Sequence, residues 1–206
     1  MRMSTVWRTL VLDMVLDGTR TAPPDRQIHL RDRLVAYILD HGFAHLTLED
    51  LARELRCSKS TLYQLAPSKA ELVVLAVRHY FRAATNQVET AVAAASAGDR
   101  VVAYLDAVAD ALSPVSRQFL HDVAEFAPAR EVYERNTELA AERVRALISE
   151  GGRAGRFRKV HARFVADVVT QTMLDIQRGG ITGRIGISDS RAYAELRALV
   201  DHTLRG

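Results

Sequence analysis

Apolar residues recur at helical spacing along almost the whole chain of 206 residues, and the strict alternation of a half-buried strand is nearly absent. Leu48, Leu51, Ala52 and Leu55 show this best, because their i, i+3, i+4, i+7 spacing places them on one face of a helix. Caps, glycines and prolines then divide the chain into segments. The expected helices cover residues 27–41, a segment beginning at Thr47, and residues 58–65, 68–97, 99–112, 116–126, 129–150, 161–178 and 190–204. The sequence therefore predicts an all-α fold.

Capping residues and glycines predict where several of these helices begin and end. Ser68 and Glu71 have the spacing of a capping box. Gly151-Gly152 is expected to end the long helix, and residues 179–186 are expected to form a glycine-rich connection. We interpret the basic loop after the long helix as solvated surface rather than as a second nucleic-acid patch. Its basic residues are Arg153, Arg156, Arg158 and Lys159.

Composition narrows the class of protein. Hydrophobic residues make up 48% of the chain and charged residues 26%, the balance of a soluble globular protein rather than a disordered one. A net charge of +3 permits nucleic-acid binding without arguing for it. No stretch approaches the roughly 20 apolar residues that cross a bilayer, so we expect a cytoplasmic protein with no membrane partner.

Residues 1–24 form an N-terminal extension. The segment from Ser4 to Asp17 is predicted to be a short amphipathic helix, followed by a linker. We favour packing of this helix on the neighbouring domain or on a second copy, because its apolar face would otherwise be exposed. Contact with the DNA minor groove through Arg20 and Arg26, or a start codon assigned too early, are the alternatives. The apolar face consists of Trp7, Leu10, Val11 and Met14.

The most informative segment is residues 31–75. Two short helices in it are joined by Arg56-Cys57-Ser58, a three-residue turn typical of a helix-turn-helix. In such a unit the first helix braces against the DNA backbone, and the second places its N-terminal part in the major groove. Leu62 is expected to face the core. The accessible side of the second helix offers small or hydrogen-bonding groups: Lys59, Ser60, Thr61, Tyr63 and Gln64.

This segment resembles the TetR family of bacterial transcription regulators. The match covers about a quarter of the chain in detail, and the long helical remainder resembles the family's layout. The residues that carry the resemblance are Gly42-Phe43, Thr47-Leu48, Leu51-Ala52, Ser58-Lys59-Ser60-Thr61-Leu62-Tyr63, Pro67-Ser68-Lys69 and Leu72.

The resemblance implies an organisation and a function. Residues 25–71 would form the DNA-binding domain, and residues 72–206 a helical domain for effector binding and dimerisation. The expected protein is a homodimeric regulator, in the first place a repressor, that binds a pseudo-palindromic DNA operator and is released by a small-molecule effector. It would be no enzyme and need no cofactor. Abundant Ala, Val and Leu suit an apolar effector.

The resemblance also implies which residues contact DNA. Thr47, Tyr63 and Lys69 match positions that contact phosphates, and Lys59, Ser60 and Thr61 match positions that face the groove. Gln64 can read adenine in the major groove. The full set of expected DNA-binding residues is Thr47, Ser58, Lys59, Ser60, Thr61, Tyr63, Gln64 and Lys69.

Three residues depart from the family pattern. Arg56 replaces the usual turn glycine, so a non-glycine residue is expected in the left-handed region. Leu65 replaces a histidine, and Ala66 replaces a bulky aromatic residue, which should loosen the packing of the recognition helix on the next helix. These departures leave an alternative open: a small-molecule-binding or interaction protein that retains the fold but has lost operator recognition. An architectural, sequence-independent DNA binder is disfavoured by the small net charge.

The resemblance further implies an effector pocket and a dimer interface in the C-terminal part. The candidates for the pocket are the aromatic and polar residues Tyr104, Phe119, His121, Phe126, Tyr133 and Met173. The candidates for the interface are apolar residues of the last two helices: Phe164, Val168, Leu196, Val200 and Leu204.

Other chemistry finds little support. His121 and Glu125 have the spacing of two metal ligands on one helix, but no third ligand is identifiable, so no metal site is expected. Nucleophile elbows, phosphate-binding glycine loops and dinucleotide fingerprints are missing from the sequence. Cys57 is the only cysteine, which excludes an internal disulfide framework and a cysteine-based zinc site. We interpret it as a small buried hydrophobic residue, with a redox sensor as the alternative.

Overall fold

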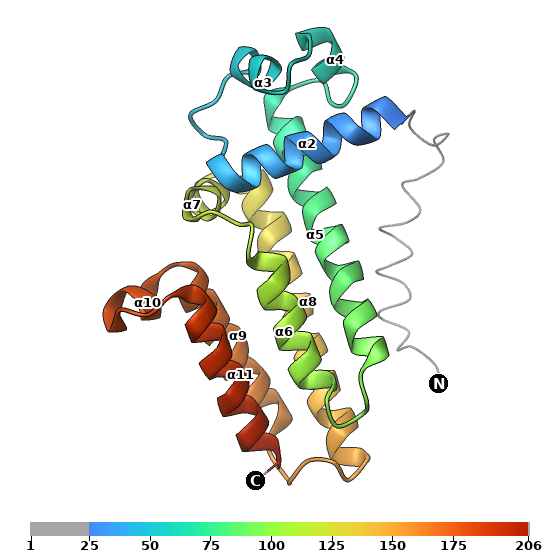
Figure 1. Ribbon diagram of the computed structural model, residues 1–206, viewed down its shortest axis with the longest axis vertical. Coiled ribbons are helices and arrows are strands. Elements are labelled where there is room, and N and C mark those ends of the chain that lie inside the picture. The colour runs from blue at the N-terminus through green and yellow to red at the C-terminus, as the bar shows by residue number, and fades with distance from the viewer. Residues whose placement is uncertain (1–24, 206) are drawn as a thin grey trace.

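The computed structural model describes residues 25–205, and the prediction of a helix and linker in residues 1–24 lies outside this range. The described residues form helices joined by turns and short loops, with no strand among them, which confirms the all-α prediction. Figure 1 shows α2, α3 and α4 at one end of an elongated molecule and the C-terminus at the other. The helices are α2 (Asp25–His41), α3 (Leu48–Glu54), α4 (Lys59–Tyr63), α5 (Lys69–Ala94), α6 (Arg100–Leu112), α7 (Arg117–Glu125), α8 (Ala127–Arg153), α9 (Ala162–Gln177), α10 (Gly180–Ile185) and α11 (Asp189–Arg205).

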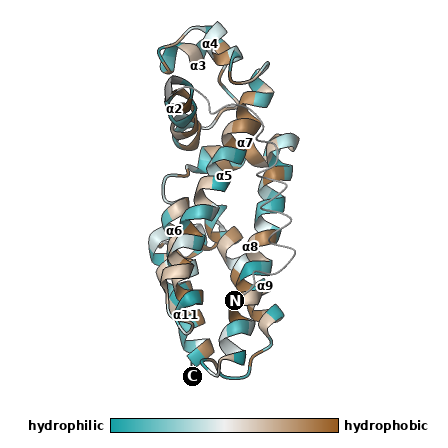
Figure 2. Cartoon of the chain, turned by 90° about the vertical axis from the view of Figure 1, so that its right-hand side faces the viewer, coloured by the Kyte–Doolittle hydropathy of each residue, from teal (hydrophilic) through white to brown (hydrophobic). Residues whose placement is uncertain are grey.

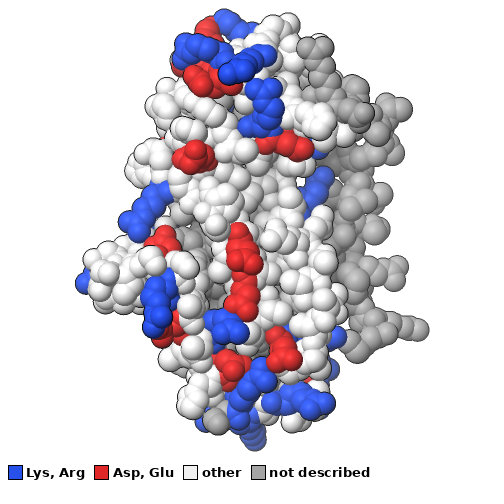
Figure 3. All heavy atoms as spheres, in the orientation of Figure 1, with Lys and Arg blue, Asp and Glu red and all other residues white. Residues whose placement is uncertain are grey.

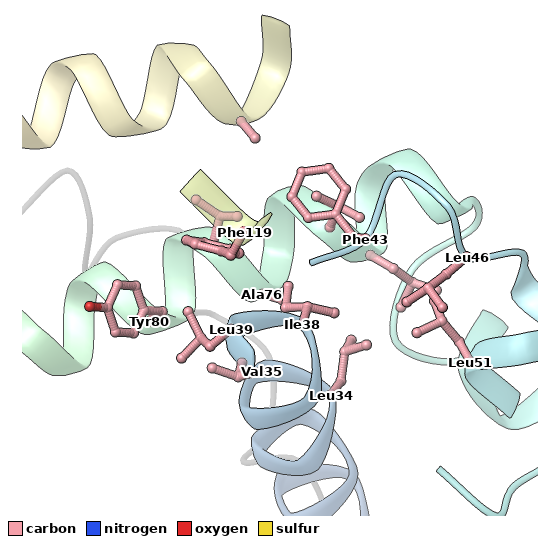
Figure 4. Packing of buried hydrophobic residues seen from close by; sticks show 14 of the residues in the cluster. Leu34, Val35, Ile38, Leu39, Phe43, Leu46, Leu51, Ala76, Tyr80 and Phe119 are labelled. Carbon is pink, nitrogen blue, oxygen red and sulfur yellow. The ribbon is translucent and has the colours of Figure 1, made fainter. Parts of the chain in front are cut away.

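The long helix α5 connects the two ends of the molecule, and two hydrophobic clusters lie along it. The upper core joins α2, α3, α4, α5, α7 and the start of α8, and the lower core joins α5, α6, α8, α9 and α11. In the upper core the ring of Phe43 lies 6.2 Å from that of Phe119, in an edge-to-face arrangement (Figure 4). Figure 2 shows the same two-ended shape from the side. The N-terminal helix-turn-helix packs in the upper core together with helices of the C-terminal part, and the lower core lies within the C-terminal helical domain.

The end of α8 differs from the prediction. Gly151-Gly152 does not end the helix, which continues to Arg153. The reason is a close approach: a Cβ atom at Gly151 would lie 2.0 Å from Cε2 of Phe157. The glycine therefore lets the following loop fold Phe157 over the last turn of the helix, a tertiary contact that local propensity does not reveal.

A short helix, α10, occupies the connection that the sequence analysis assigned to a glycine-rich loop. Gly179 and Gly186 flank it with φ angles of 71° each, the left-handed conformation that glycine adopts without a steric penalty. Six residues between two such glycines are enough for one helical turn and a half. The glycine-rich connection between α9 and α11 is thus present as expected, and the short helix inside it was not predicted.

Residues 25–205 contain no helix that could span a membrane. The helices described there are either too short or too polar to cross a bilayer.

Candidate nucleic-acid interface

The helix-turn-helix begins with a capping box at α3. Thr47 Oγ1 accepts a hydrogen bond from the Asp50 amide at 3.1 Å, and the Asp50 carboxylate accepts from the Thr47 amide at 2.9 Å. The carboxylate also accepts from the Thr47 hydroxyl and from Arg53. These bonds, led by the Thr47 hydroxyl, lower the pKa of Asp50 to about 2. The expected cap at Thr47 is thus present, and the side chain proposed to contact a phosphate is already bonded to a carboxylate.

Ser58 caps α4, the candidate recognition helix. Its Oγ accepts a hydrogen bond from the Thr61 amide at 3.1 Å and lies 2.7 Å from the Ser60 hydroxyl. Leu62 is fully buried, as predicted, whereas the Tyr63 side chain is half-exposed. Thr61, expected on the accessible side, is only partly exposed, whereas five residues of this segment are exposed: Ser58, Lys59, Ser60, Tyr63 and Gln64.

The turn between α3 and α4 contains Arg56 with a φ of +48°. This confirms that a non-glycine residue adopts the left-handed conformation here, at a steric cost that glycine would avoid. The guanidinium of Arg33 on α2 donates to the Leu55 carbonyl at 2.7 Å and so braces the same turn. Cys57 is partly buried against the upper core, and burial raises the pKa of its thiol. A raised pKa favours a packing role over thiolate chemistry.

Lys59, the first residue of α4, forms an ion pair with Glu49 of α3. Both side chains are at least half-exposed. The hydrogen bond to Lys59 lowers the pKa of Glu49, and the same bond raises the pKa of Lys59. The lysine that the sequence analysis directed at the DNA groove is therefore held by a neighbouring carboxylate.

Lys69, at the start of α5, points back to the loop between α2 and α3. Its Nζ donates to the Ala44 carbonyl at 3.1 Å. Partial burial lowers the pKa of Lys69, and the nearby carboxylates of Asp122 and Asp50 oppose this shift. Lys69 thus contacts a loop residue that stands three positions before Thr47 in the sequence.

Asp122 is a residue that the sequence analysis did not single out. It lies on α7 and is buried, yet it bonds to the loop between α2 and α3, almost 80 residues away in sequence. Its carboxylate accepts from the amides of Phe43 at 2.5 Å and Ala44 at 2.8 Å, and from the Gln118 side chain at 2.7 Å. Burial alone would raise the pKa of Asp122, but these hydrogen bonds outweigh it and the pKa is lowered.

Two further contacts fix α7 against α2 and the loop that follows it. The Ser116 amide donates to the Leu39 carbonyl of α2 at 2.8 Å. Gly42 lies so close to Asp122 that a Cβ atom there would be 2.6 Å from the carboxylate oxygen. One signal in the sequence pointed to this: Asp122 is a charged residue on the same helical face as the apolar Phe119 and Phe126.

The structure does not bring the six pocket candidates together. Phe119, Phe126 and Tyr133 belong to the upper core, and Tyr104 and Met173 to the lower core. His121 is exposed on α7, because the buried face of that helix is taken by Phe119, Asp122 and Val123. His121 and Glu125 form no group of three or more metal-ligating side chains within residues 25–205.

A polar chain that the sequence analysis missed lies between the two cores. The Tyr133 hydroxyl donates to Gln177 Oε1 at 2.5 Å, and Gln177 Nε2 donates to the Tyr193 hydroxyl at 3.3 Å. Desolvation raises the pKa of Tyr133, and that of Tyr193 to about 12, so both hydroxyls stay protonated: the Tyr133 hydroxyl is a donor and the Tyr193 hydroxyl an acceptor in this chain. Among the pocket candidates, Tyr133 is the one that lies where helices of the two cores meet.

The dimer candidates divide into two groups. Phe164 is 67% exposed and Val168 40% exposed on α9. The three α11 candidates, in contrast, are buried in the lower core of their own chain, so they are not available to a partner: Leu196, Val200 and Leu204. The expectation was wrong for α11 because its apolar stripe packs on α6 and α9. The exposed apolar residues nearby are Leu199 of α11 and Ile185 of α10, neither of which was predicted.

The chain is similar to known proteins in one segment of its sequence and in its fold. The sequence model for the family described as bacterial regulatory proteins, tetR family, matches residues 32–76. The fold is similar to that of a putative transcriptional regulator from Saccharomonospora viridis in complex with choline, with 19% identity, a TM-score of 0.72, and coverage of 88% of this chain and 98% of that one. It is also similar to a TetR transcription regulator from Haloarcula marismortui, with 17% identity, a TM-score of 0.71, and coverage of 87% and 98%. No curated protein sequence matches the chain.

The matched segment carries an unusual charge for a nucleic-acid interface. Residues 32–76 contain more acidic than basic side chains, with a net charge of −1. The positive charge of the chain therefore lies outside this segment, and acidic and basic side chains are mixed at the end formed by α3 and α4 (Figure 3). The basic residues are Arg33, Arg53, Arg56, Lys59 and Lys69, and the acidic ones are Asp32, Asp40, Glu49, Asp50, Glu54 and Glu71.

Proposed function

We propose that this chain, which belongs to the tetR family of bacterial regulatory proteins, is a homodimeric transcriptional repressor released from its operator by a small molecule. The observation that carries the proposal is the capped recognition helix α4. Ser58 fixes its start and Leu62 anchors it in the upper core, so that the side chains between and after them face outward. That is the geometry of a helix that enters the major groove.

The proposed DNA contacts are the eight residues expected from the sequence. Lys59, Ser60, Thr61 and Gln64 would face the groove, while Thr47, Tyr63 and Lys69 would contact phosphates and Ser58 would lie beside them at the start of α4. Lys59, Ser60, Tyr63 and Gln64 are exposed in α4 and directly after it, and Lys69 lies beside the loop that precedes Thr47, which supports the assignment. We place residues 25–71 in the DNA-binding domain and the rest in the regulatory domain.

The proposed dimer interface is the outer face of α9 to α11. Phe164, Val168 and Leu199 expose apolar surface there, and a second copy related by a twofold axis would cover the same patch on both chains. Twofold symmetry then favours a pseudo-palindromic operator, with one recognition helix in each half-site.

The proposed effector site lies between the upper and lower cores, near Tyr133. The hydroxyls of Tyr133 and Tyr193 and the carboxamide of Gln177 would supply the few polar contacts that orient a small molecule in such a site. The solved structure from Saccharomonospora viridis, which contains choline, supports small-molecule binding by this fold. The effector would act by binding two arrangements of the dimer unequally.

Fluorescence anisotropy with DNA enriched by the protein from a random duplex library tests the proposal. A scrambled duplex of equal length and composition, at the same physiological salt, is the control. We expect a preference of roughly 10³-fold or more for the enriched DNA. The net charge of −1 favours the second candidate, a protein that retains the fold without reading DNA. Equal and weak binding to both duplexes would support that candidate and overturn the first.

A further inference from the structure

We propose that Glu49 sets the DNA affinity of this chain, by competing with DNA phosphates and base edges for the ammonium group of Lys59. This inference rests on the proposed function, because it requires that α4 meets DNA. Glu49 is not itself a DNA contact in this proposal. It lowers the affinity for DNA of every sequence by the same factor.

The contact between the two residues joins the two helices of the helix-turn-helix. Glu49 lies in the first turn of α3, and Lys59 is the first residue of α4, ten residues later. Lys59 is the single charged residue in α4, so it carries the positive charge of the candidate recognition helix. In the absence of DNA, the ammonium group of Lys59 is therefore paired with the Glu49 carboxylate.

The other two acidic side chains of α3 already interact with other groups, so Glu49 is the carboxylate that faces Lys59. Asp50 is bonded to Thr47 and to Arg53. Glu54, at the other end of α3, lies 3.6 Å from Arg53. Glu49 and Lys59 are 60% and 50% exposed, so an approaching phosphate reaches the ammonium and can displace the carboxylate.

Because this end of the molecule has few excess cations, the competition for Lys59 has a measurable effect on DNA affinity. Non-specific DNA binding comes almost entirely from cationic side chains that release counterions from phosphates. Residues 32–76 have a net charge of −1, so each cation at this end contributes a large share of the attraction. A carboxylate that holds the lysine of α4 therefore reduces binding to bulk DNA, where the protein would otherwise be retained away from its operator.

The test is the substitution Glu49→Gln, which keeps the shape of the side chain and removes its charge. Affinities for the enriched and the scrambled duplex are measured by anisotropy over a series of salt concentrations. We expect both affinities to rise about 2- to 5-fold, the range of an exposed ion pair, with the ratio between the duplexes unchanged. The salt dependence should become steeper by up to about one released counterion. Glu54→Gln is the matched control, since it makes the same charge change on the same helix away from Lys59, and it should raise affinity less.

A second background shows whether the effect passes through Lys59. In Lys59→Gln the additional substitution Glu49→Gln should give no more than the rise seen with Glu54→Gln. If the full rise persists without Lys59, the effect is general repulsion between Glu49 and DNA, and the proposal is wrong. If Glu49→Gln instead weakens binding to the enriched duplex alone, Glu49 positions Lys59 for reading bases, which also overturns the proposal.

Failure of this inference is distinguishable from failure of the proposed function. A wild-type protein that shows no preference for any duplex contradicts the function. A wild-type protein with a clear preference, in which Glu49→Gln changes neither affinity, contradicts the competition alone. Thermal unfolding of each variant confirms that the comparison is made between equally folded proteins.

Discussion

The two ends of this molecule were equally easy to recognise as helical, but they differ in how their side chains are used. At the DNA-binding end, polar caps at Thr47 and Ser58 fix each short helix, and the predicted inner residue Leu62 is buried. At the far end, α11 has the predicted helix, but its apolar stripe faces its own chain. The residues that cap a helix can be recognised in the sequence, because they lie close to the residues they bond. The choice between packing inside a chain and packing on a second copy depends on tertiary structure.

The largest expected effect comes from breaking the contact between α7 and the loop between α2 and α3. Asp122→Ala removes the acceptor for the buried amide of Phe43 and for the partly buried amide of Ala44. A buried unsatisfied amide costs about 1–3 kcal/mol and a partly buried one less, so we expect a loss of roughly 2–5 kcal/mol in the free energy of unfolding, measured with urea. Glu125→Ala, an exposed acidic residue on the same helix, is the control and should change little.

The pH dependence of the same site gives a second readout. The pKa of Asp122 is lowered on folding, so its contribution is fully present above the ordinary pKa of 3.8 and is lost as the pH falls through the depressed folded value. Wild-type protein and Asp122→Asn should therefore differ in stability at neutral pH and converge in acid. A difference that stays constant between pH 7 and pH 3 would show that the carboxylate charge is not what stabilises the loop.

The next largest effect on stability is expected at the face of α11 that packs inside its own chain. Leu196→Ala opens a cavity in the lower core and should lower the free energy of unfolding by about 2–4 kcal/mol. Leu199→Ala, three residues later and 61% exposed, should leave the unfolding of an isolated protomer nearly unchanged. Equal losses from the two substitutions, in denaturation curves taken at low protein concentration, would contradict the division of α11 into an inner and an outer face.

The sequence could predict most of the fold for one physical reason. Helix starts depend on side chains within three residues of the cap, such as Ser58 with Thr61, and these are visible in a single chain. Asp122 could not be placed in this way, because its partners lie in a loop on another helix pair. The ion pair between Glu49 and Lys59 is intermediate: both residues lie in the predicted motif, but only the turn geometry brings them together.

The same limit explains the errors at the far end. Gly151 was interpreted from local propensity as the end of a helix, yet it accommodates Phe157; Gly179 does follow the end of α9, but it also begins α10. The pocket candidates lie apart for a similar reason: Tyr104 and Phe119 are both aromatic residues on amphipathic helices, but they pack into different cores. Periodicity shows that a residue faces inward, but it does not show which cluster it joins.

The exposed apolar face of α9 gives a prediction about dimerisation. Phe164→Ala should weaken dimerisation by about 1–2 kcal/mol, corresponding to a dissociation constant roughly 5- to 30-fold higher, because apolar surface buried between two copies is lost. Sedimentation equilibrium measures this directly. Arg163→Ala is the neighbouring control, also exposed but not apolar. A dimer unaffected by Phe164→Ala would place the interface elsewhere.

The smallest expected effect concerns the one place at the DNA-binding end where the local rule is broken. Arg56 holds a φ of +48° in the turn between α3 and α4, where glycine avoids the clash of a Cβ atom with the backbone. Arg56→Gly should therefore raise the free energy of unfolding by up to about 1 kcal/mol, while the greater freedom of glycine in the unfolded chain offsets part of the gain. Arg56→Ala removes the same charge and keeps the Cβ atom, so it separates strain from electrostatics in a urea titration. If alanine stabilises the chain as much as glycine does, the gain comes from removing a positive charge and the left-handed turn carries no measurable strain.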